Sequence, residues 1–189
     1  MFIAGYSNKL QPTALLRSTI DGTALATPMA PHIQPSYYAA IIAAEVIGQV
    51  KINGTVGGVA ARALELTVDH PRVSAYAFYS PTEGNNWRVS RLLLINSQAH
   101  FRNVTSRGRV HIDLSFSSVN STNALAPPQT MTTKRLVIPY ADDTSGITWA
   151  GQTYETSNGQ VSGELKVEKS AVERGVDLWD TEAILVYFD

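Results

Sequence analysis

The chain has 189 residues, of which only 16% are charged, and its formal net charge is −1. This composition offers no electrostatic argument for binding nucleic acid or an anionic membrane, so we expect neither as a partner. The chain has no cysteine, which excludes disulfides, thiol nucleophiles and cysteine-based metal sites. Its four histidines lack metal-ligand spacing, and no metal or cofactor is expected.

The first 35 residues have no sustained hydrophobic period and are interrupted by prolines, so we predict an ordered but irregular lead-in. The N-terminus has neither a basic segment nor a sustained apolar one, and we expect no signal peptide. No apolar run approaches the roughly 18 residues needed to cross a bilayer.

A short helix is predicted over residues 36–48. Ser36 is the expected N-cap, and Gly48 is the expected residue just past the helix, where it can adopt a left-handed conformation. The residues between are apolar or aromatic on every side, with Glu45 as the only charge. Such a helix must be covered by protein on several faces, and a lone carboxylate on it is expected to be structural.

From residue 60 onward the hydrophobic period changes to two, which is typical of β-strands. Turn signals separate the strands, at residues 83–86 and at Asn158-Gly159. We predict a mainly β fold, an antiparallel β-sandwich of about seven or eight strands preceded by one buried helix. The polar stretch 117–133 is predicted to be a long surface loop. The expected strands are 63–68, 73–79, 87–95, 110–116, 134–138, 161–167 and 182–188, the last being nearly all apolar and therefore central.

Three Asn-x-Ser/Thr sequons begin at Asn53, Asn103 and Asn120 and are candidate N-glycosylation sites. The run from Asp142 to Gly146 has a faint likeness to a calcium loop but lacks the spaced ligands, which favours a plain turn. The tryptophans are candidate sugar-stacking residues, although packing in a core or between domains is the commoner role. They are Trp87, Trp149 and Trp179.

Several stretches spread over the chain resemble fungal β-glucuronidases of glycoside hydrolase family 79, which also includes heparanase-like enzymes. Residues 137–155 (VIPYADDTSGITWAGQTYE) are the most specific of them. The others are 16–22 (LRSTIDG), 32–40 (HIQPSYYAA) with 43–45 (AAE), 74–79 (SAYAFY) and 93–97 (LLINS).

The resemblance implies two domains. Residues 1–50, with helix 36–48, would be the end of a catalytic (β/α)8 barrel, and residues 51–189 a C-terminal β-sandwich. Barrel and sandwich together would then cover the helix. The chain is expected to be a fragment or a truncated product of a secreted enzyme of carbohydrate metabolism, and its partner would be the rest of the barrel.

The resemblance also implies that this chain carries no catalytic residue. Retaining hydrolases of this kind use two carboxylates about 5 Å apart, and in the family both lie in the barrel, upstream of the residues present here. One remnant of the substrate site is implied at Gly5 and Tyr6, which resemble a pair that binds the uronate carboxylate of a glucuronide-containing glycan. A backbone amide and a phenol can both donate to a carboxylate.

Two functions from different classes follow. The first is a non-catalytic β domain that supports a catalytic barrel, inactive as a hydrolase by itself. The alternative is a free-standing carbohydrate-binding module, which would need two or three exposed, coplanar aromatic side chains on one face. Burial of the tryptophans would count against the module.

Overall fold

The computed structural model describes Ile33 and residues 35–48, 51–52, 55–56, 62–82, 87–116 and 126–188. Within these ranges there is one α-helix, α1 (Pro35–Ile47), and one short 3-10 helix, η3 (Val172–Arg174). The strands are β1 (Lys51–Ile52), β2 (Thr55–Val56), β3 (Arg62–Leu66), β4 (Val73–Pro81), β5 (Trp87–Asn96), β6 (Arg109–Ile112), β7 (Thr130–Val137), β8 (Thr148–Trp149), β9 (Glu168–Ala171), β10 (Val176–Trp179) and β11 (Glu182–Phe188).

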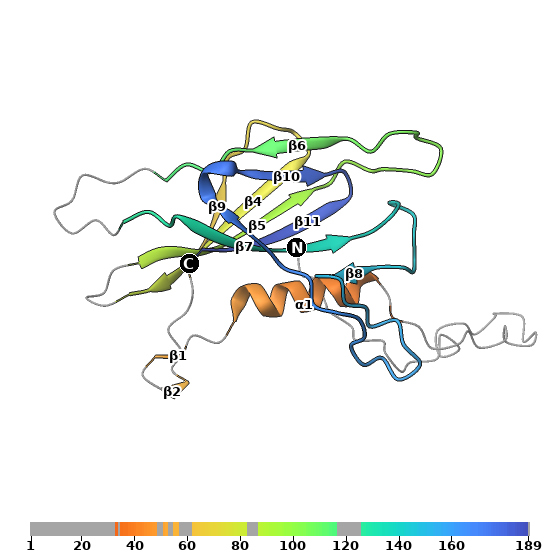
Figure 1. The fold of residues 1–189 in the computed structure, drawn as a ribbon, viewed down its shortest axis with the longest axis horizontal. Coiled ribbons are helices and arrows are strands. Elements are labelled where there is room, and N and C mark those ends of the chain that lie inside the picture. The colour runs from red at the N-terminus through yellow and green to blue at the C-terminus, as the bar shows by residue number, and fades with distance from the viewer. Residues whose placement is uncertain are drawn as a thin grey trace, which may run out of the picture.

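The described strands form one large antiparallel sheet and two small ones. The large sheet has seven strands in the order β3-β4-β5-β11-β7-β8, with β9 pairing with the other end of β7. Strands β6 and β10 pair with each other, as do β1 and β2. In Figure 1 the β6–β10 pair lies over one face of the large sheet, and α1 runs across the other face.

Each face of the large sheet therefore has its own apolar core. On the β6–β10 side the core includes Leu94, Met131 and Leu178, and on the α1 side it includes Tyr38, Ile147 and Trp149. Because successive side chains of a strand point to opposite faces of the sheet, the same strands contribute residues to both cores. The fold is thus an unequal β-sandwich with a helix packed on its outer face.

Strand β11 lies at the centre of this arrangement. It pairs with β5 on one side and β7 on the other. Ile184, Val186 and Phe188 face the β6–β10 core, whereas Leu185 faces α1. A strand buried on both faces needs apolar residues at nearly every position, which explains its continuous apolar run. The predictions of a β-sandwich preceded by one helix and of a central final strand are both confirmed.

The helix ends as predicted, but it begins one residue early. Gly48 has φ +49° and its amide donates to the Ala44 carbonyl at 3.0 Å, which is the left-handed helix ending expected of it. The helix begins at Pro35, so Ser36 lies inside the first turn and is not the N-cap. Proline suits the first helical position because its missing N–H would have no partner there.

The prediction of a strand over residues 161–167 is wrong. Apolar residues recur in this segment, but they face no core: Val161, Leu165 and Val167 are between 41% and 51% exposed. Gly163 has φ +96°, which is incompatible with a regular strand, and the segment makes only one isolated bridge, Ser162 with Thr153. Alternation without burial does not specify a strand.

The predicted loop 117–133 is wrong at its end, because Thr130 begins β7 and Met131 and Thr133 are buried in the sheet. Residues 117–125 lie outside the described residues, as do 83–86, although β4 and β5 pair on either side of 83–86 as a hairpin would. The boundary predicted between residues 50 and 51 stays a prediction. In the described residues no helix is both long enough and apolar enough to cross a membrane.

Candidate functional site

The most connected polar group between α1 and the sheet is the Glu45 carboxylate. Its Oε2 accepts a hydrogen bond from the indole Nε1 of Trp149 at 2.8 Å, and its Oε1 accepts one from the Tyr187 hydroxyl at 2.6 Å. Lys134 on β7 donates to Oε1 as well and forms an ion pair. Three donors from β8, β11 and β7 thus converge on one side chain of the helix.

This arrangement keeps Glu45 ionised. Burial alone would raise the pKa of the carboxyl, but the hydrogen bonds from Lys134, Tyr187 and Trp149 outweigh it, and the pKa is lowered. The pKa of Tyr187 is raised, first by burial and then by its hydrogen bond to Glu45. A carboxylate with a depressed pKa and both oxygens occupied is unsuited to general acid catalysis. Glu45 is a structural group, as the sequence led us to expect.

Tyr38 fixes the N-terminal half of α1. Its side chain is fully buried, and its hydroxyl accepts a hydrogen bond from the Tyr154 amide at 3.1 Å and shares one with Thr153 Oγ1 at 3.0 Å. The Tyr37 and Tyr154 rings meet edge to face, with centroids 5.3 Å apart. Burial raises the pKa of Tyr38, so it remains a neutral donor.

Arg91 on β5 fixes the C-terminal end of α1. Its Nη1 donates to the Val46 carbonyl at 2.7 Å, one of the last carbonyls of the helix. A cation at this position also interacts favourably with the helix dipole. We call the contacts of Tyr38, Glu45 and Val46 with the sheet the helix–sheet junction. It joins three points along α1 to strands β5, β7, β8 and β11 and to the segment after β8.

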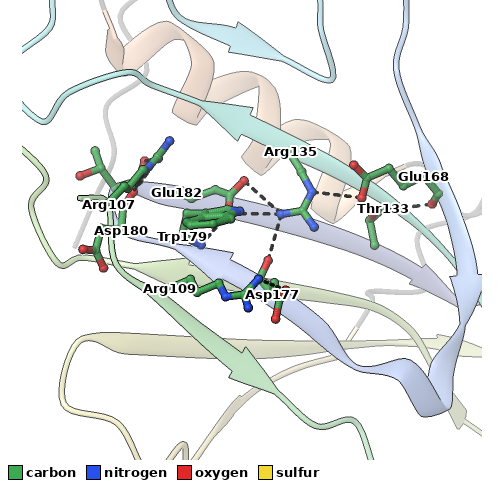
Figure 2. A network of polar contacts seen from close by, with 10 residues as sticks. Arg107, Arg109, Thr133, Arg135, Glu168, Asp177, Trp179, Asp180 and Glu182 are labelled. Atoms are coloured by element: carbon green, nitrogen blue, oxygen red, sulfur yellow. Dashed lines mark hydrogen bonds and ion pairs between the residues drawn. The ribbon is translucent and has the colours of Figure 1, made fainter. Parts of the chain in front are cut away.

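A second polar network lies on the other face of the sheet, next to β10 (Figure 2). Arg135 Nη1 donates to Glu182 Oε1 at 3.1 Å and to the Asp177 carbonyl at 3.0 Å, and its Nε donates to Glu168 at 3.2 Å. Glu182 is 5% exposed and also accepts from the Trp179 amide at 2.8 Å. This network links the β6–β10 sheet to the large sheet.

Most of the predicted site residues lie outside the described residues. These are Gly5, Tyr6, Asn53 and Asn120, so their proposed roles stay predictions. Asn103 is described, and it lies in an exposed turn between β5 and β6.

The tryptophans do not form a sugar-binding platform. Trp149 is 4% exposed and belongs to the core beneath α1. Trp87 and Trp179 are partly buried, and each lies under an arginine, with Arg62 4.4 Å and Arg109 5.5 Å from the ring centroids. Tryptophans that are buried or covered by an arginine do not offer the exposed, coplanar faces that a carbohydrate-binding module requires.

The segment around Asp142 is the plain turn that its sequence favours. Asp143 accepts a hydrogen bond from the Tyr140 amide at 3.1 Å and pairs with Arg102. Glu155 accepts from the amides of Gly146 and Ile147 at 2.7 and 3.0 Å. In the described part of the chain no group of three His, Asp or Glu side chains could hold a metal ion.

Comparison with known families decides what kind of domain this is. The family model for the glycosyl hydrolase family 79 C-terminal beta domain matches residues 75–185, more than half of the chain. The chain belongs to this family. The matched segment runs from β4 to β11 and contains most of the core on the β6–β10 side, so the assignment rests on the sandwich itself. The resemblance found in the sequence is confirmed.

A solved structure has the same fold. The crystal structure of a 4-O-alpha-L-rhamnosyl-beta-D-glucuronidase from Fusarium oxysporum 12S, in complex with Rha-GlcA, superposes with a TM-score of 0.60 at 21% identity. The match covers 83% of this chain but only 30% of that enzyme. The chain thus spans less than a third of the length of this relative. A comparison with curated proteins finds no match.

The helix–sheet junction could not be read from the sequence as a unit. Glu45 was singled out as the only charge on its helix, but its partners Lys134, Trp149 and Tyr187 are 89, 104 and 142 residues away. Glu182 was expected on a solvated face, which is wrong because it is 5% exposed, and its pairing with Arg135 was not predicted. Their one signal is a charge at a strand position that would otherwise be apolar.

Proposed function

We propose that this family 79 β domain is non-catalytic and supports the end of a catalytic barrel that completes the enzyme. The observation that carries the proposal is the convergence of Lys134, Trp149 and Tyr187 on Glu45. In this proposal α1 is a barrel helix, because residues 32–45 resemble the end of the family's barrel. A barrel helix attached this firmly to the sheet would let the β domain hold the barrel's last segment in place.

The exposed side of α1 supports the same role. Tyr38, Ile42 and Val46 face the sheet and are buried, whereas Ala44 and Ile47 are exposed, Ile47 by 65%. A helix with apolar residues on its outer side is suited to a second packing partner. In the proposal this partner is the rest of the barrel, with residues 1–50 as part of it and residues 51–189 as the β domain.

The parent enzyme is proposed to be an extracellular hydrolase that acts on a glucuronide-containing glycan. The resemblance to β-glucuronidases and the glucuronidase activity named for the Fusarium relative support this substrate class. Within the described residues, the carboxylate best placed at the helix–sheet junction is fully engaged by donors, which agrees with a domain that leaves the chemistry to the barrel.

Two assays on the purified chain test the proposal. We expect no hydrolysis of an aryl β-glucuronide and no heat of binding with glucuronide oligosaccharides. Turnover above the buffer rate would show an active enzyme, and saturable glycan binding would show a carbohydrate-binding module. Either result would overturn the proposal.

A matched pair of variants tests the packing surface. Ile47→Lys should reduce the binding of a hydrophobic dye without changing Tm. Leu64→Lys places the same charge at a 53% exposed position on β3 and should leave dye binding closer to that of the wild type. Equal effects of the two variants would count against a packing surface on α1.

A further inference from the structure

A sequon is displayed in an exposed turn of the connection between β5 and β6 (Figure 1). The sequence is Phe101-Arg102-Asn103-Val104-Thr105. The Val104 amide donates to the Phe101 carbonyl at 2.9 Å, which closes a β-turn with Arg102 and Asn103 at its two central positions. All five residues are exposed, and the Asn103 side chain makes no hydrogen bond to any described residue.

The turn is held in place from one side by Arg102. Its guanidinium pairs with Asp143 and lies 4.5 Å from the centroid of the Tyr140 ring. Tyr140 in turn stacks on His100, with ring centroids 5.3 Å apart, and the Ala141 amide donates to the His100 carbonyl at 2.8 Å. The turn is therefore attached to the 139–143 segment, while the side chains on either side of Arg102 remain open to solvent.

We propose that Asn103 is an N-glycosylation acceptor and that Phe101 is the surface on which the first sugar packs. Phe101 is 46% exposed although it is a large aromatic residue, and it lies two residues before the acceptor in the same closed turn. Phe101 and Asn103 are the first and third residues of this tight turn and both are exposed, so the Phe101 ring is within reach of the base of a glycan on Asn103. An exposed Phe alone would mean little, since single apolar side chains on a surface are common. The position of Phe101 two residues before the acceptor gives its ring a packing partner, the first sugar of the glycan.

The reaction uses a lipid-linked oligosaccharide diphosphate as the donor. The Asn103 amide nitrogen forms a bond to C1 of the first sugar, and the C1–O bond to the diphosphate breaks. The lipid diphosphate leaves, and the amide loses one proton to water. Thr105 supplies the hydroxyl that the sequon requires two residues after the acceptor.

A glycan on Asn103 would cover apolar surface of the turn. A pyranose ring has an apolar face of C–H groups, and a Phe ring offers a flat apolar surface with a negative face to the C–H groups. Packing the two removes from water apolar surface that the turn otherwise exposes. The glycan should thus stabilise the fold through Phe101.

The test supplies its own secretory route, so it does not depend on where the parent enzyme resides. The chain is secreted from a yeast in an Asn53→Gln, Asn120→Gln background that leaves Asn103 as its only sequon. The protein is treated with an N-glycanase, which converts a glycosylated Asn to Asp, and is digested only afterwards. The peptide that carries residue 103 is then sequenced by mass spectrometry. N103Q and T105A are the controls. If the variant with Asn53→Gln and Asn120→Gln is not secreted, the same peptide analysis is carried out on the wild-type chain.

We expect Asp at position 103 after deglycosylation, no modification in N103Q or T105A, and a Tm that falls by roughly 2–4 °C when the glycan is removed. In F101A the glycan should still be attached, but its removal should leave Tm unchanged. Secreted protein with an unmodified Asn103 would overturn the acceptor assignment. An equal fall in Tm with and without Phe101 would overturn the packing assignment. Neither result bears on the support of a barrel.

Discussion

The Glu45 carboxylate on α1 and the indole Nε1 of Trp149 on β8 are 2.8 Å apart, although 104 residues separate them in the chain. Trp149 also belongs to the apolar core that α1 shares with the sheet. Together with the bonds from Lys134 and Tyr187, it makes the helix part of the β domain's packing.

Removing the Glu45 carboxylate should destabilise the chain. Glu45→Ala leaves the Lys134 ammonium, the Tyr187 hydroxyl and the Trp149 N–H without their acceptor, so we expect a loss of about 2–3 kcal/mol in the free energy of unfolding. Glu45→Gln keeps an acceptor oxygen and should lose about 1 kcal/mol. Urea denaturation measures both. Glu65→Ala, at an exposed position on β3, is the control and should change stability by less than about 0.5 kcal/mol. A loss in Glu45→Ala no larger than in the control would show that the bonds contribute nothing.

His111 should titrate above its usual pKa of 6.5. The hydrogen bond from its Nδ1 to Asp177 Oδ1, 2.7 Å long, is the largest cause, and Asp113 on its other side adds to it. A raised pKa in the folded state contributes stability below the unfolded pKa, and this contribution is lost as pH rises through the folded pKa. His111→Gln should therefore lower Tm more at pH 6 than at pH 9.

An NMR titration of the imidazole measures the His111 pKa directly. Asp177→Asn should bring it down towards the usual value, because the charge on the bonded carboxylate is removed. A His111 pKa at or below 6.5 in the wild-type chain would contradict the geometry around it.

Gly175 should tolerate no side chain. It has φ +61° and ψ −163°, a region that only glycine adopts readily, and a Cβ there would lie 2.5 Å from the Ile112 carbonyl on β6. Gly175→Ala should cost about 3 kcal/mol, since it combines strain with a clash against backbone. Gly146→Ala is the matched control, because Gly146 also has positive φ but nothing within 4 Å, and it should cost about 1 kcal/mol. Equal costs in thermal denaturation would mean that the approach of η3 to β6 is looser than described.

Arg135 and Glu182 should behave as a coupled pair. Arg135→Leu leaves the Glu182 carboxylate, 5% exposed, without its cation, and we expect a loss of about 3 kcal/mol. The double variant with Glu182→Leu should lose less than the sum of the single variants, because no buried charge remains. Arg109→Leu breaks a more exposed pair with Asp177 and should destabilise the chain less than Arg135→Leu does. Strict additivity in the Arg135–Glu182 cycle would contradict the network in Figure 2.

Local sequence patterns predicted the strands whose apolar residues are buried, and the end of the helix. Strands β4, β5 and β11 and the end of α1 at Gly48 follow from periodicity, apolar runs and a glycine that can take positive φ. The pattern over residues 161–167 failed because a strand also needs a partner and a core to face. Strands β9 and β10 were missed because each has only four residues, too few for a period to be visible.

The polar contacts were beyond the sequence for a different reason. Lys134 and Arg135 are neighbours on β7, yet one pairs with Glu45 on the helix side and the other with Glu182 near the small sheet. The partner of each side chain depends on the register of β7 against β11, and the sequence alone does not specify this register. Resemblance to the family could predict the domain, but not the contacts that join α1 to it.

Native-state hydrogen exchange followed by mass spectrometry tests most directly whether α1 and the sheet form one structural unit. The amides of α1 should be protected to nearly the same free energy as those of β11, because opening the helix breaks the Glu45 contacts and exposes the core beneath it. In Glu45→Ala the protection of α1 should fall first. Rapid exchange over residues 35–48 in the wild-type chain, with β11 still protected, would contradict the proposal that the β domain holds this helix.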